Sequence, residues 1–414
     1  MKKIFLSCSK VILAGLFVGI MMGVYHYIAQ HLISFSNEIL QKEWYIFLIC
    51  LVFSLVVYGL IYLLNKKIPG YFGSGLPQIE AYYRGWYKFS AWKMLVLLFI
   101  NSLFAFFSGF PLGLEGPSIT ISTCVGMLTN KLYKEEDVDL EACSGSAGFS
   151  CAFVAPFAGL MYLIEENKKL IKLSLIIKGI VIIGISYFVS TFIYHHPVLP
   201  YFEVEMLPIK YYWLLVVIVL LSIGASKLFS LITIKIKDLK FIKPLLIYIT
   251  IGLIILFMVI KRYFNIMVGG GSSLITESLI DYSLLALIGI LIFRLFFTPL
   301  SVNSLISGGM VFPLLAIGAL VGIAGVKAYS LVDSEIINYL GIFIIVTMTC
   351  LFGTTTKCPL TGLVIGLHCA PIKIIIIPLV ISTLLIMVIS RIFKFESIYH
   401  LLERRIPGYS KHHE

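Results

Sequence analysis

One acidic residue, Glu115, lies in a setting where its chemistry can serve a function. It belongs to the run Gly113-Leu114-Glu115-Gly116-Pro117, and the neighbouring stretches are almost wholly apolar. An ionised side chain at membrane depth costs roughly 2.5 to 3.5 kcal/mol on insertion scales, so such an acid is by default a functional-site hypothesis. The sequence therefore singles out Glu115 as the first functional candidate.

The residues around Glu115 predict that it lies at the start of a helix. Proline suits the first helical position, and the glycines permit an irregular approach to it. The positive end of the helix dipole favours an anion there, by about 0.3 to 1 kcal/mol when exposed and up to about 2 when partly buried. The carboxylate itself or a free anion would fit equally well.

Two further glycine-containing runs predict helices that begin within the membrane. Gly73-Ser74-Gly75-Leu76-Pro77 precedes one, and Ser307-Gly308-Gly309-Met310-Val311-Phe312-Pro313 precedes the other. Ser74 could donate its O–H to an anion or could cap only its own helix, and the sequence supports both interpretations. The runs 113–117 and 307–313 interrupt the two halves of the chain at corresponding places, which is consistent with an inverted repeat and points to a transport site near the membrane midplane.

The composition excludes a soluble protein. Hydrophobic residues make up 59% of the 414-residue chain, charged residues only 13%, and the mean hydropathy is +1.00. Apolar segments recur from end to end without a polar linker, so we predict a single transmembrane domain, 1–414. The eight cysteines include no CxxC pair, which indicates core residues rather than a metal or redox site. We expect that the protein binds no metal and no cofactor. We expect membrane lipid to surround it.

The net charge of +11 indicates membrane topology rather than nucleic-acid binding, because the charges lie in connections between apolar segments. The basic residues that we expect to be cytoplasmic are Lys2, Lys3, Lys10, Lys66, Lys67, Lys235, Lys237, Lys240, Lys243, Arg404 and Arg405. The segment 195–208 has two glutamates and no Lys or Arg, as an outer loop would; Lys261 and Arg262 are an exception to the pattern. We expect both termini in the cytoplasm and a multi-pass protein of the cell (inner) membrane.

Apolar periodicity predicts long helices at about 11–35, 44–64, 92–108, 171–194, 211–234, 244–262, 284–300, 335–352 and 372–392. Shorter pieces are expected to begin at Leu76, Pro117, Ser144, Pro156, Ser272, Met310 and Pro359. Irregular backbone at membrane depth is tolerated only where it is buried or lines a cavity. These pieces are therefore expected to be broken helices around an internal site.

The three glycine-containing runs, GSGLP at 73–77, GLEGP at 113–117 and GGMVFP at 308–313, resemble in order and spacing the anion-binding signatures of the CLC chloride channels and chloride/proton exchangers. The runs 155–159, followed by Glu165-Glu166, and 359–362 extend the resemblance over most of the chain. It implies an all-α homodimeric membrane protein with one anion pathway per subunit. Each subunit would contain two inverted repeats, at about 40–194 and 210–405.

The resemblance also implies roles for particular residues. Ser74, Tyr399 and the backbone N–H groups of Met310 and Val311 would coordinate the anion. Glu115 would be the gating glutamate, and Glu166 the internal glutamate that passes protons from the cytoplasm.

Each role has a plainer alternative. Glu115 could be a helix cap, Tyr399 an interfacial anchor, and Glu165-Glu166 a charged helix end. Leu114 and Val311 depart from the family pattern, which usually has Lys or Arg and Phe at these positions. These departures affect gating and turnover more than anion chemistry.

The resemblance favours chloride/proton exchange, with a passive voltage- or pH-gated chloride channel as the alternative. A fluoride/proton antiporter is less favoured, because this chain has Ser74 and Tyr399, and the fluoride-selective branch of the family typically lacks a serine and a tyrosine at these positions. An intramembrane hydrolase would need a nucleophile and a base. Ser144, Ser146 and His368 are available, but no GxSxG or HExxH spacing accompanies them, so we expect no enzyme.

Overall fold

The computed structural model describes residues 2–42, 73–166, 172–195, 198–238, 244–260, 269–304, 306–404 and 406, with scattered positions at 45–63 and Tyr409. The expected helix at 44–64 and the basic pairs Lys66-Lys67, Lys168-Lys169 and Lys261-Arg262 lie largely or wholly outside these residues.

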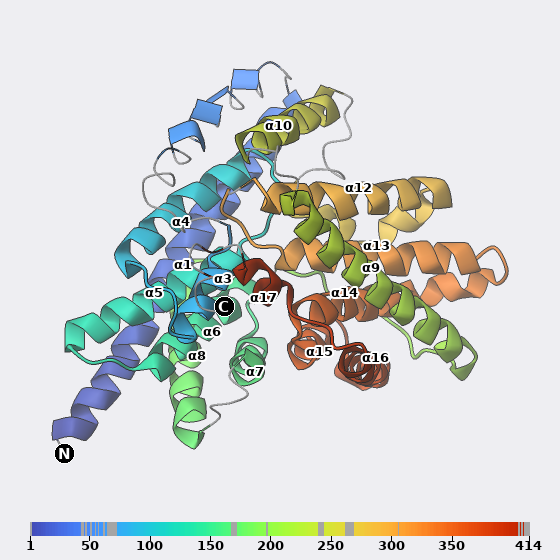
Figure 1. Cartoon of the computed structure of the whole chain (residues 1–414). Helices are drawn as coiled ribbons and strands as arrows, with labels where there is room; N and C mark the ends of the chain where they lie inside the picture. Colours follow the sequence, from blue (N-terminus) through green and yellow to red (C-terminus); the bar gives the residue numbers. More distant parts are fainter. Residues whose placement is uncertain are drawn as a thin grey trace.

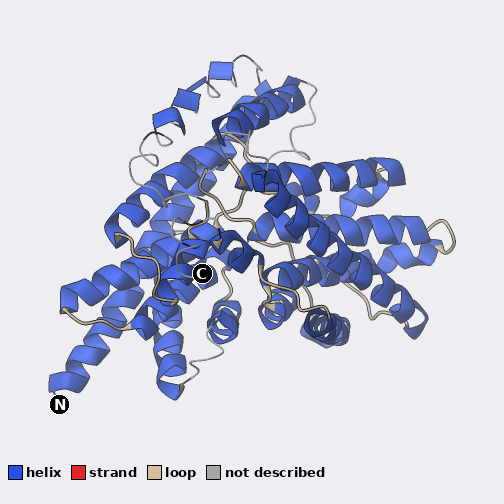
Figure 2. Ribbon diagram, in the orientation of Figure 1, coloured by secondary structure: helices blue, strands red, loops and turns tan. Residues whose placement is uncertain are grey.

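The described part of the chain is all-helical, and Figure 2 shows no strand in it. The first half contains α1 (Lys2–Lys42), α3 (Leu76–Tyr83), α4 (Ala91–Phe107), α5 (Glu115–Tyr133), α6 (Val138–Phe153), α7 (Pro156–Glu166) and α8 (Leu173–Ile193). The second half contains α9 (Tyr212–Asp238), α10 (Pro244–Ile260), α12 (Leu284–Val302), α13 (Val311–Tyr329), α14 (Leu340–Thr356), α15 (Pro359–Leu367), α16 (Ile372–Ile392) and α17 (Ile398–Glu403). Short 3-10 turns occur at Ile209–Tyr211, Ser272–Leu274, Glu277–Asp281 and Ser334–Tyr339.

Most expected helices are confirmed, with three corrections. Ser144 does not begin a helix but lies inside α6, because Asp137 provides the cap earlier in the chain. Ser272 begins only a 3-10 turn. The helix after Met310 is not a short piece: α13 has 19 residues and is one of 7 described helices long and apolar enough to cross a membrane. The apolar run there continues to Tyr329, so the glycines set where the helix begins without shortening it.

Burial divides the helices into an inner and an outer set. Most residues of α13 and α14 are buried, whereas only a third of those of α8 and α16 are. Large apolar side chains such as Phe188 and Phe192 on α8 are exposed, as lipid contact requires. Figure 1 shows α13 and α14 side by side and α17 beside α3, although α3 and α17 come from opposite ends of the chain. The inner helices therefore surround the place where the glycine-containing runs end.

Small residues bring α1 and α8 into close contact. A Cβ added at Gly15 would lie 3.0 Å from the β-carbon of Ile185. One added at Gly19 would lie 2.7 Å from that of Val189, and one added at Gly23 would lie 2.8 Å from that of Ile193. Lipid offers helices no hydrophobic reason to associate, so close backbone approach and dispersion contacts must stabilise such pairs. The glycines on one face of α1 thus form its contact surface for α8.

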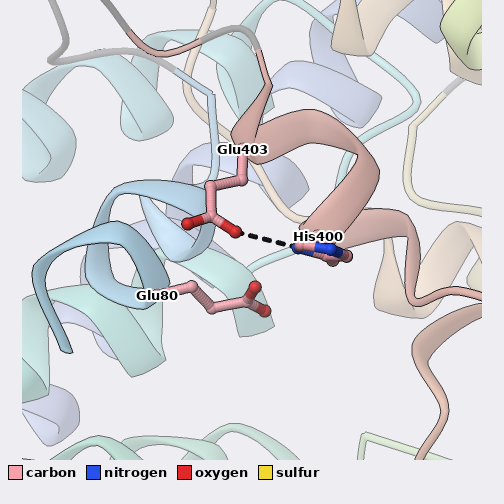
Figure 3. A group of neighbouring side chains, drawn as sticks. All are labelled: Glu80, His400 and Glu403. Carbon is pink, nitrogen blue, oxygen red and sulfur yellow. Dashed lines mark hydrogen bonds and ion pairs between the residues drawn. The ribbon is translucent and has the colours of Figure 1, made fainter. Parts of the chain in front are cut away.

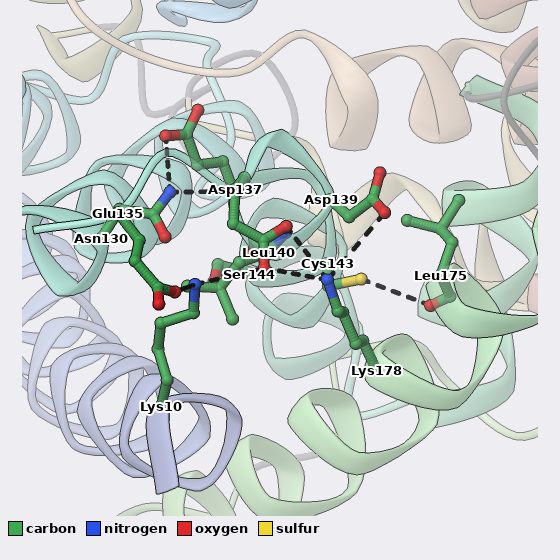
Figure 4. Close-up of polar contacts among 11 residues, drawn as sticks. Lys10, Asn130, Glu135, Asp137, Asp139, Leu140, Cys143, Ser144, Leu175 and Lys178 are labelled. Atoms are coloured by element: carbon green, nitrogen blue, oxygen red, sulfur yellow. Dashed lines mark hydrogen bonds and ion pairs between the residues drawn. The ribbon is translucent and has the colours of Figure 1, made fainter. Parts of the chain in front are cut away.

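A charged cluster joins three helices of the first half at one end (Figure 4). The Asp137 carboxylate accepts a hydrogen bond from the Leu140 N–H at 3.1 Å, capping α6, and from Lys178 Nζ at 2.8 Å. Lys10 Nζ lies 3.3 Å from Asp137 and 2.7 Å from Glu135. Burial alone would raise the pKa of Asp137, but the Lys178 hydrogen bond and charge outweigh burial and hold that pKa below its usual range.

This cluster predicts a loss of stability in acid. The folded-state pKa of Asp137 is depressed, so its contribution is present above the unfolded-state value of about 3.9 and is lost as pH falls through the folded-state pKa. Asp137→Asn keeps a capping side chain but removes the charge. We expect a lower melting temperature than wild type at pH 7 and a smaller further loss between about pH 5 and pH 3.

Thermal unfolding in detergent across this pH range measures the effect. Asp139→Asn is the matched control, because Asp139 lies 4.0 Å from Lys178 and makes a much weaker ion pair. Identical pH profiles for wild type and Asp137→Asn would contradict the assignment.

Candidate functional site

The three glycine-containing runs meet at one point inside the protein. A Cβ added at Gly116 would lie 2.7 Å from the Ser74 Cβ and 3.0 Å from the Gly309 Cα. Under 3.0 Å no real Cβ fits, so glycine is required where these three backbones approach. The convergence places residues from near 74, 115 and 310 within contact distance, as the sequence predicts.

A two-sided backbone pairing joins the first and second halves at this point. The Gly113 N–H donates to the Gly309 carbonyl at 2.7 Å, and the Gly309 N–H donates to the Gly113 carbonyl at 2.6 Å. This antiparallel bridge precedes the first turns of both α5 and α13. It fixes the N-terminal end of one helix relative to the other.

The Glu115 side chain lies at the N-terminal end of α13. Glu115 is the first residue of α5, as predicted, and is only 2% exposed. Its Oε2 accepts a hydrogen bond from the Phe312 N–H at 3.4 Å. A Cβ added at Gly113 would lie 2.2 Å from that oxygen, so the carboxylate folds back over Gly113. The buried charge thus meets an unpaired backbone donor and the positive end of a second helix.

Met310 and Val311, whose amides the family resemblance assigns to anion coordination, lie at the start of α13. Met310 is the N-cap of α13 and Val311 is its first residue, and both are buried. Their N–H groups belong to the first turn, which has no intrahelical acceptors. Sequence reasoning missed Phe312, whose amide already contacts Glu115. The sequence could have indicated Phe312, because it belongs to the same glycine-containing run, 307–313, as Met310 and Val311.

Ser74 and Tyr399 both lie buried beside these helix ends. The N-cap of α3 is Gly75, in the left-handed region with φ 78°, and Ser74 Oγ accepts only a 3.4 Å contact from the Leu76 N–H. Its O–H can therefore donate elsewhere. Tyr399 is 2% exposed, and its hydroxyl has no hydrogen-bond partner in the described part of the structure. An orphaned buried hydroxyl is rare, and here it suits a ligand rather than an anchor in the lipid headgroups.

A small cavity of about 40 Å³ lies next to the anion-coordinating candidates. Its lining includes Ser74 from the run 73–77, Gly308 and Met310 from the run 307–313, and Leu402 of α17. Tyr399 belongs to the same buried cluster as Met310, Val311 and Tyr162, and Tyr162 lines a second space together with Glu166. The anion candidates and both proton candidates therefore belong to one region of the molecule.

Glu165 and Glu166 are neighbours in sequence with different surroundings. Glu165 is buried and accepts hydrogen bonds from the backbone N–H groups of Leu360 and Thr361, at 3.0 and 2.7 Å, and from the Thr361 hydroxyl at 2.6 Å. It caps α15. Glu166 ends α7, is exposed, and accepts a hydrogen bond from Cys358 Sγ at 3.3 Å. Of the two, Glu166 is the acid that solvent reaches.

Glu166 opens into a vestibule of about 450 Å³. Glu80, Arg84, Glu165, Lys357 and His400 also line this space. Apolar side chains such as Leu76, Ile79 and Ile119 line the rest of it. Glu166 therefore lies among several other titratable side chains of one space.

A charged group at the edge of the vestibule joins α3 to α17. Figure 3 shows Glu80, His400 and Glu403 directed toward one another. The Arg84 guanidinium lies among them, with Nη1 at 2.8 Å from Glu403 and 2.9 Å from His400 Nδ1. Glu403 also accepts from Trp86 Nε1 at 3.0 Å. The group already contains its own cation, so it acts as a strut between the helices of Ser74 and Tyr399 rather than as a metal site.

Two further polar residues within the membrane helices were not predicted. Arg294 of α12 is fully buried and donates from Nη1 to the Gly269 carbonyl at 2.8 Å. His26 of α1 is buried and lies 2.9 Å from Ser118 Oγ, one turn beyond Glu115. Each is a lone polar residue in an apolar run, and that pattern could have identified it.

Comparisons with known proteins identify the family of the chain. The family model described as "Voltage gated chloride channel" matches residues 58–391. The H(+)/Cl(-) exchange transporter ClcA of Vibrio campbellii is 27% identical, over 97% of this chain and 89% of that protein. The ClcA of Vibrio cholerae is 28% identical, also over 97% and 89%.

Solved structures share the fold. A slow cyanobacterial Cl-/H+ antiporter superposes with a TM-score of 0.82 at 20% identity and covers 98% of both chains. A CLC-type fluoride/proton antiporter gives 0.74 at 18% identity, over 95% of this chain and 96% of the other. At these identities the likeness concerns the fold alone. The family model, however, spans most of the sequence, and the chain therefore belongs to the voltage-gated chloride channel (CLC) family of membrane transport proteins.

Proposed function

We propose that the protein exchanges chloride for protons across the cytoplasmic (inner) membrane. The observation that supports this most directly is the Glu115 carboxylate at the N-terminal end of α13, bound to the Phe312 amide. An ionised carboxylate there competes with chloride for the same donors, because both are anions at one helix N-terminus. When protonated, the side chain loses its charge and leaves the donors to chloride. Anion and proton occupancy are thereby linked at one residue.

The proposed chloride site consists of neutral donors. Ser74 and Tyr399 would supply two hydroxyls, and the N–H groups of Met310 and Val311 would supply the backbone contribution. The orphaned Tyr399 hydroxyl supports this assignment. Neutral donors replace part of the hydration shell of chloride without binding it as tightly as a fixed positive charge would, so the ion can leave.

Glu166 is the proposed inner proton residue. Both acids line the vestibule, but Glu165 is buried and held by donors of α15, whereas Glu166 is exposed, and this difference favours Glu166. The names of the ClcA relatives support coupled exchange rather than passive conduction. For this chain we therefore propose coupled exchange, and flux measurements distinguish it from channel activity.

The assembly and orientation are proposed as well. The family resemblance supports a homodimer in which each subunit has its own pathway and two inverted repeats. The antiparallel pairing of Gly113 with Gly309 is what such a symmetry would produce where the repeats meet. The distribution of Lys and Arg supports cytoplasmic termini.

Replacing the gate tests its role. Glu115→Gln mimics the protonated acid, so we expect chloride flux in liposomes to persist and to lose its dependence on pH. Proton movement should stop. The measurement is simultaneous recording of chloride and proton flux from reconstituted vesicles, and uphill proton pumping by Glu115→Gln would exclude the gating role.

Removing either proposed hydroxyl should weaken chloride binding. Hydrogen bonds to charged groups contribute about 1.5 to 3 kcal/mol, so Ser74→Ala and Tyr399→Phe should each raise the chloride dissociation constant by about tenfold or more. Calorimetric titration of the detergent-solubilised protein measures this change. Ser301→Ala is the control, because its hydroxyl donates only to the Phe297 carbonyl of its own helix. Unchanged affinity in both site variants would remove the two hydroxyls from the site.

Glu166→Gln decides between exchanger and channel. In an exchanger this variant should lose uphill proton transport and retain chloride flux, because the anion path does not use Glu166. A pH electrode, an imposed chloride gradient and a potassium clamp of the voltage suffice. A wild type with chloride flux and no proton movement would establish a channel and reject the proposed exchange.

A further inference from the structure

The surroundings of Glu166 include one hydrogen-bond donor that the proposed function does not use. Glu166 is the last residue of α7, where the dipole of its own helix disfavours a negative charge. Cys358 is the N-cap of α15, a helix of 9 residues, and its Sγ lies 3.3 Å from Glu166 Oε1. The acid at the end of one helix is thus directed at the positive end of another.

The two adjacent acids divide the donors of α15 between them. Glu165 takes the backbone N–H groups of Leu360 and Thr361 and the Thr361 hydroxyl. Glu166 receives the thiol of Cys358. A thiol is a weak donor, so it can orient a carboxylate without binding it as firmly as three amide and hydroxyl donors bind Glu165.

The Cys358 thiol also has a second acceptor. Its Sγ lies 3.8 Å from the Thr356 carbonyl oxygen, farther than from Glu166. The S–H can therefore turn to this carbonyl when Glu166 takes up a proton or moves into the vestibule. No buried donor is left unsatisfied in either arrangement, which keeps the cost of the change low.

The position of Cys358 connects the vestibule to the anion site. Cys358 is only 2% exposed, whereas Glu166 faces the vestibule. Cys358 belongs to the same buried cluster as Tyr162 and Tyr399, and Tyr162 lines the vestibule together with Glu166. The thiol therefore lies on the protein side of Glu166, toward Tyr399 and away from bulk solvent.

We propose that Cys358 is a positioning residue for proton transfer, and that its S–H···O bond holds the Glu166 carboxylate toward the interior while leaving it free to exchange protons. This inference rests on the proposed proton role of Glu166. It requires no change in the oxidation state of the thiol and no covalent step, since the proton is bound and released by the carboxylate.

Transport by reconstituted full-length protein tests the role. Loss of one modest hydrogen bond, about 0.5 to 1 kcal/mol, should lower the ratio of protons to chloride moved by Cys358→Ala about two- to fivefold. Chloride flux should be unchanged. Cys358→Ser restores an O–H donor at the same position and should recover the wild-type ratio.

Cys369→Ala is the matched control. Cys369 is also buried and lies just after the other end of α15, and its thiol donates to the Ile365 carbonyl of that helix. A purely structural role for Cys358 would reduce both fluxes together. An unchanged ratio in Cys358→Ala, or a ratio that Cys358→Ser fails to recover, would overturn the positioning role.

The S–H stretching band in the infrared tests the contact independently of transport. The difference between wild type and Cys358→Ala isolates this band, which should shift in Glu166→Gln because the carboxylate acceptor has become an amide. A band unaffected by Glu166→Gln would overturn the contact itself. Failure of the proposed function looks different: the wild type would move no protons and would match Glu166→Gln in flux, while the infrared comparison would still decide the contact.

Discussion

One constraint governs this structure: an apolar protein interior offers few hydrogen-bond donors that can stabilise a negative charge. No water is available in the hydrocarbon to solvate an anion, so a buried acid must be met either by a side-chain donor, as Arg84 meets Glu403, or by the free amides of helix N-termini. The first turn of α13 supplies them for Glu115, and the first turn of α15 supplies them for Glu165. The close contacts of Gly113, Gly116 and Gly309 serve to bring these helix ends together.

This constraint explains why the two halves of the chain cannot vary independently. The start of α5 provides the carboxylate, and the start of α13 provides the amide that it contacts. The Gly113–Gly309 bridge fixes their separation. At the other end of the region, the strut of Arg84 and Glu403 sets the distance between α3 and α17. A shift in the Gly113–Gly309 bridge or in the Arg84–Glu403 ion pair would change the space between Ser74 and Tyr399, although no residue of the site would be altered.

Local sequence rules were sufficient for the start of α5 and for the approximate bounds of most described helices. The pattern of glycine and proline around Glu115 has a direct backbone meaning, and apolar length determines where a helix can cross. The rules failed at Ser144, because a cap is defined by which side chain reaches the first turn, and Asp137 does so first. The family resemblance predicted that the three glycine-containing runs meet, but the contact of Glu166 with Cys358 could not be predicted, since it depends on tertiary packing.

The glycine face of α1 has a consequence for how the protein is made. Helix α1 ends at Lys42 and its partner α8 begins at Leu173, so the ribosome adds about 130 residues before that face can be covered. At ordinary rates of synthesis this takes on the order of 10 s. During that interval the newly inserted first helix exposes to lipid a groove shaped for another helix. Membrane insertion of α1 is therefore separated in time from its assembly with α8.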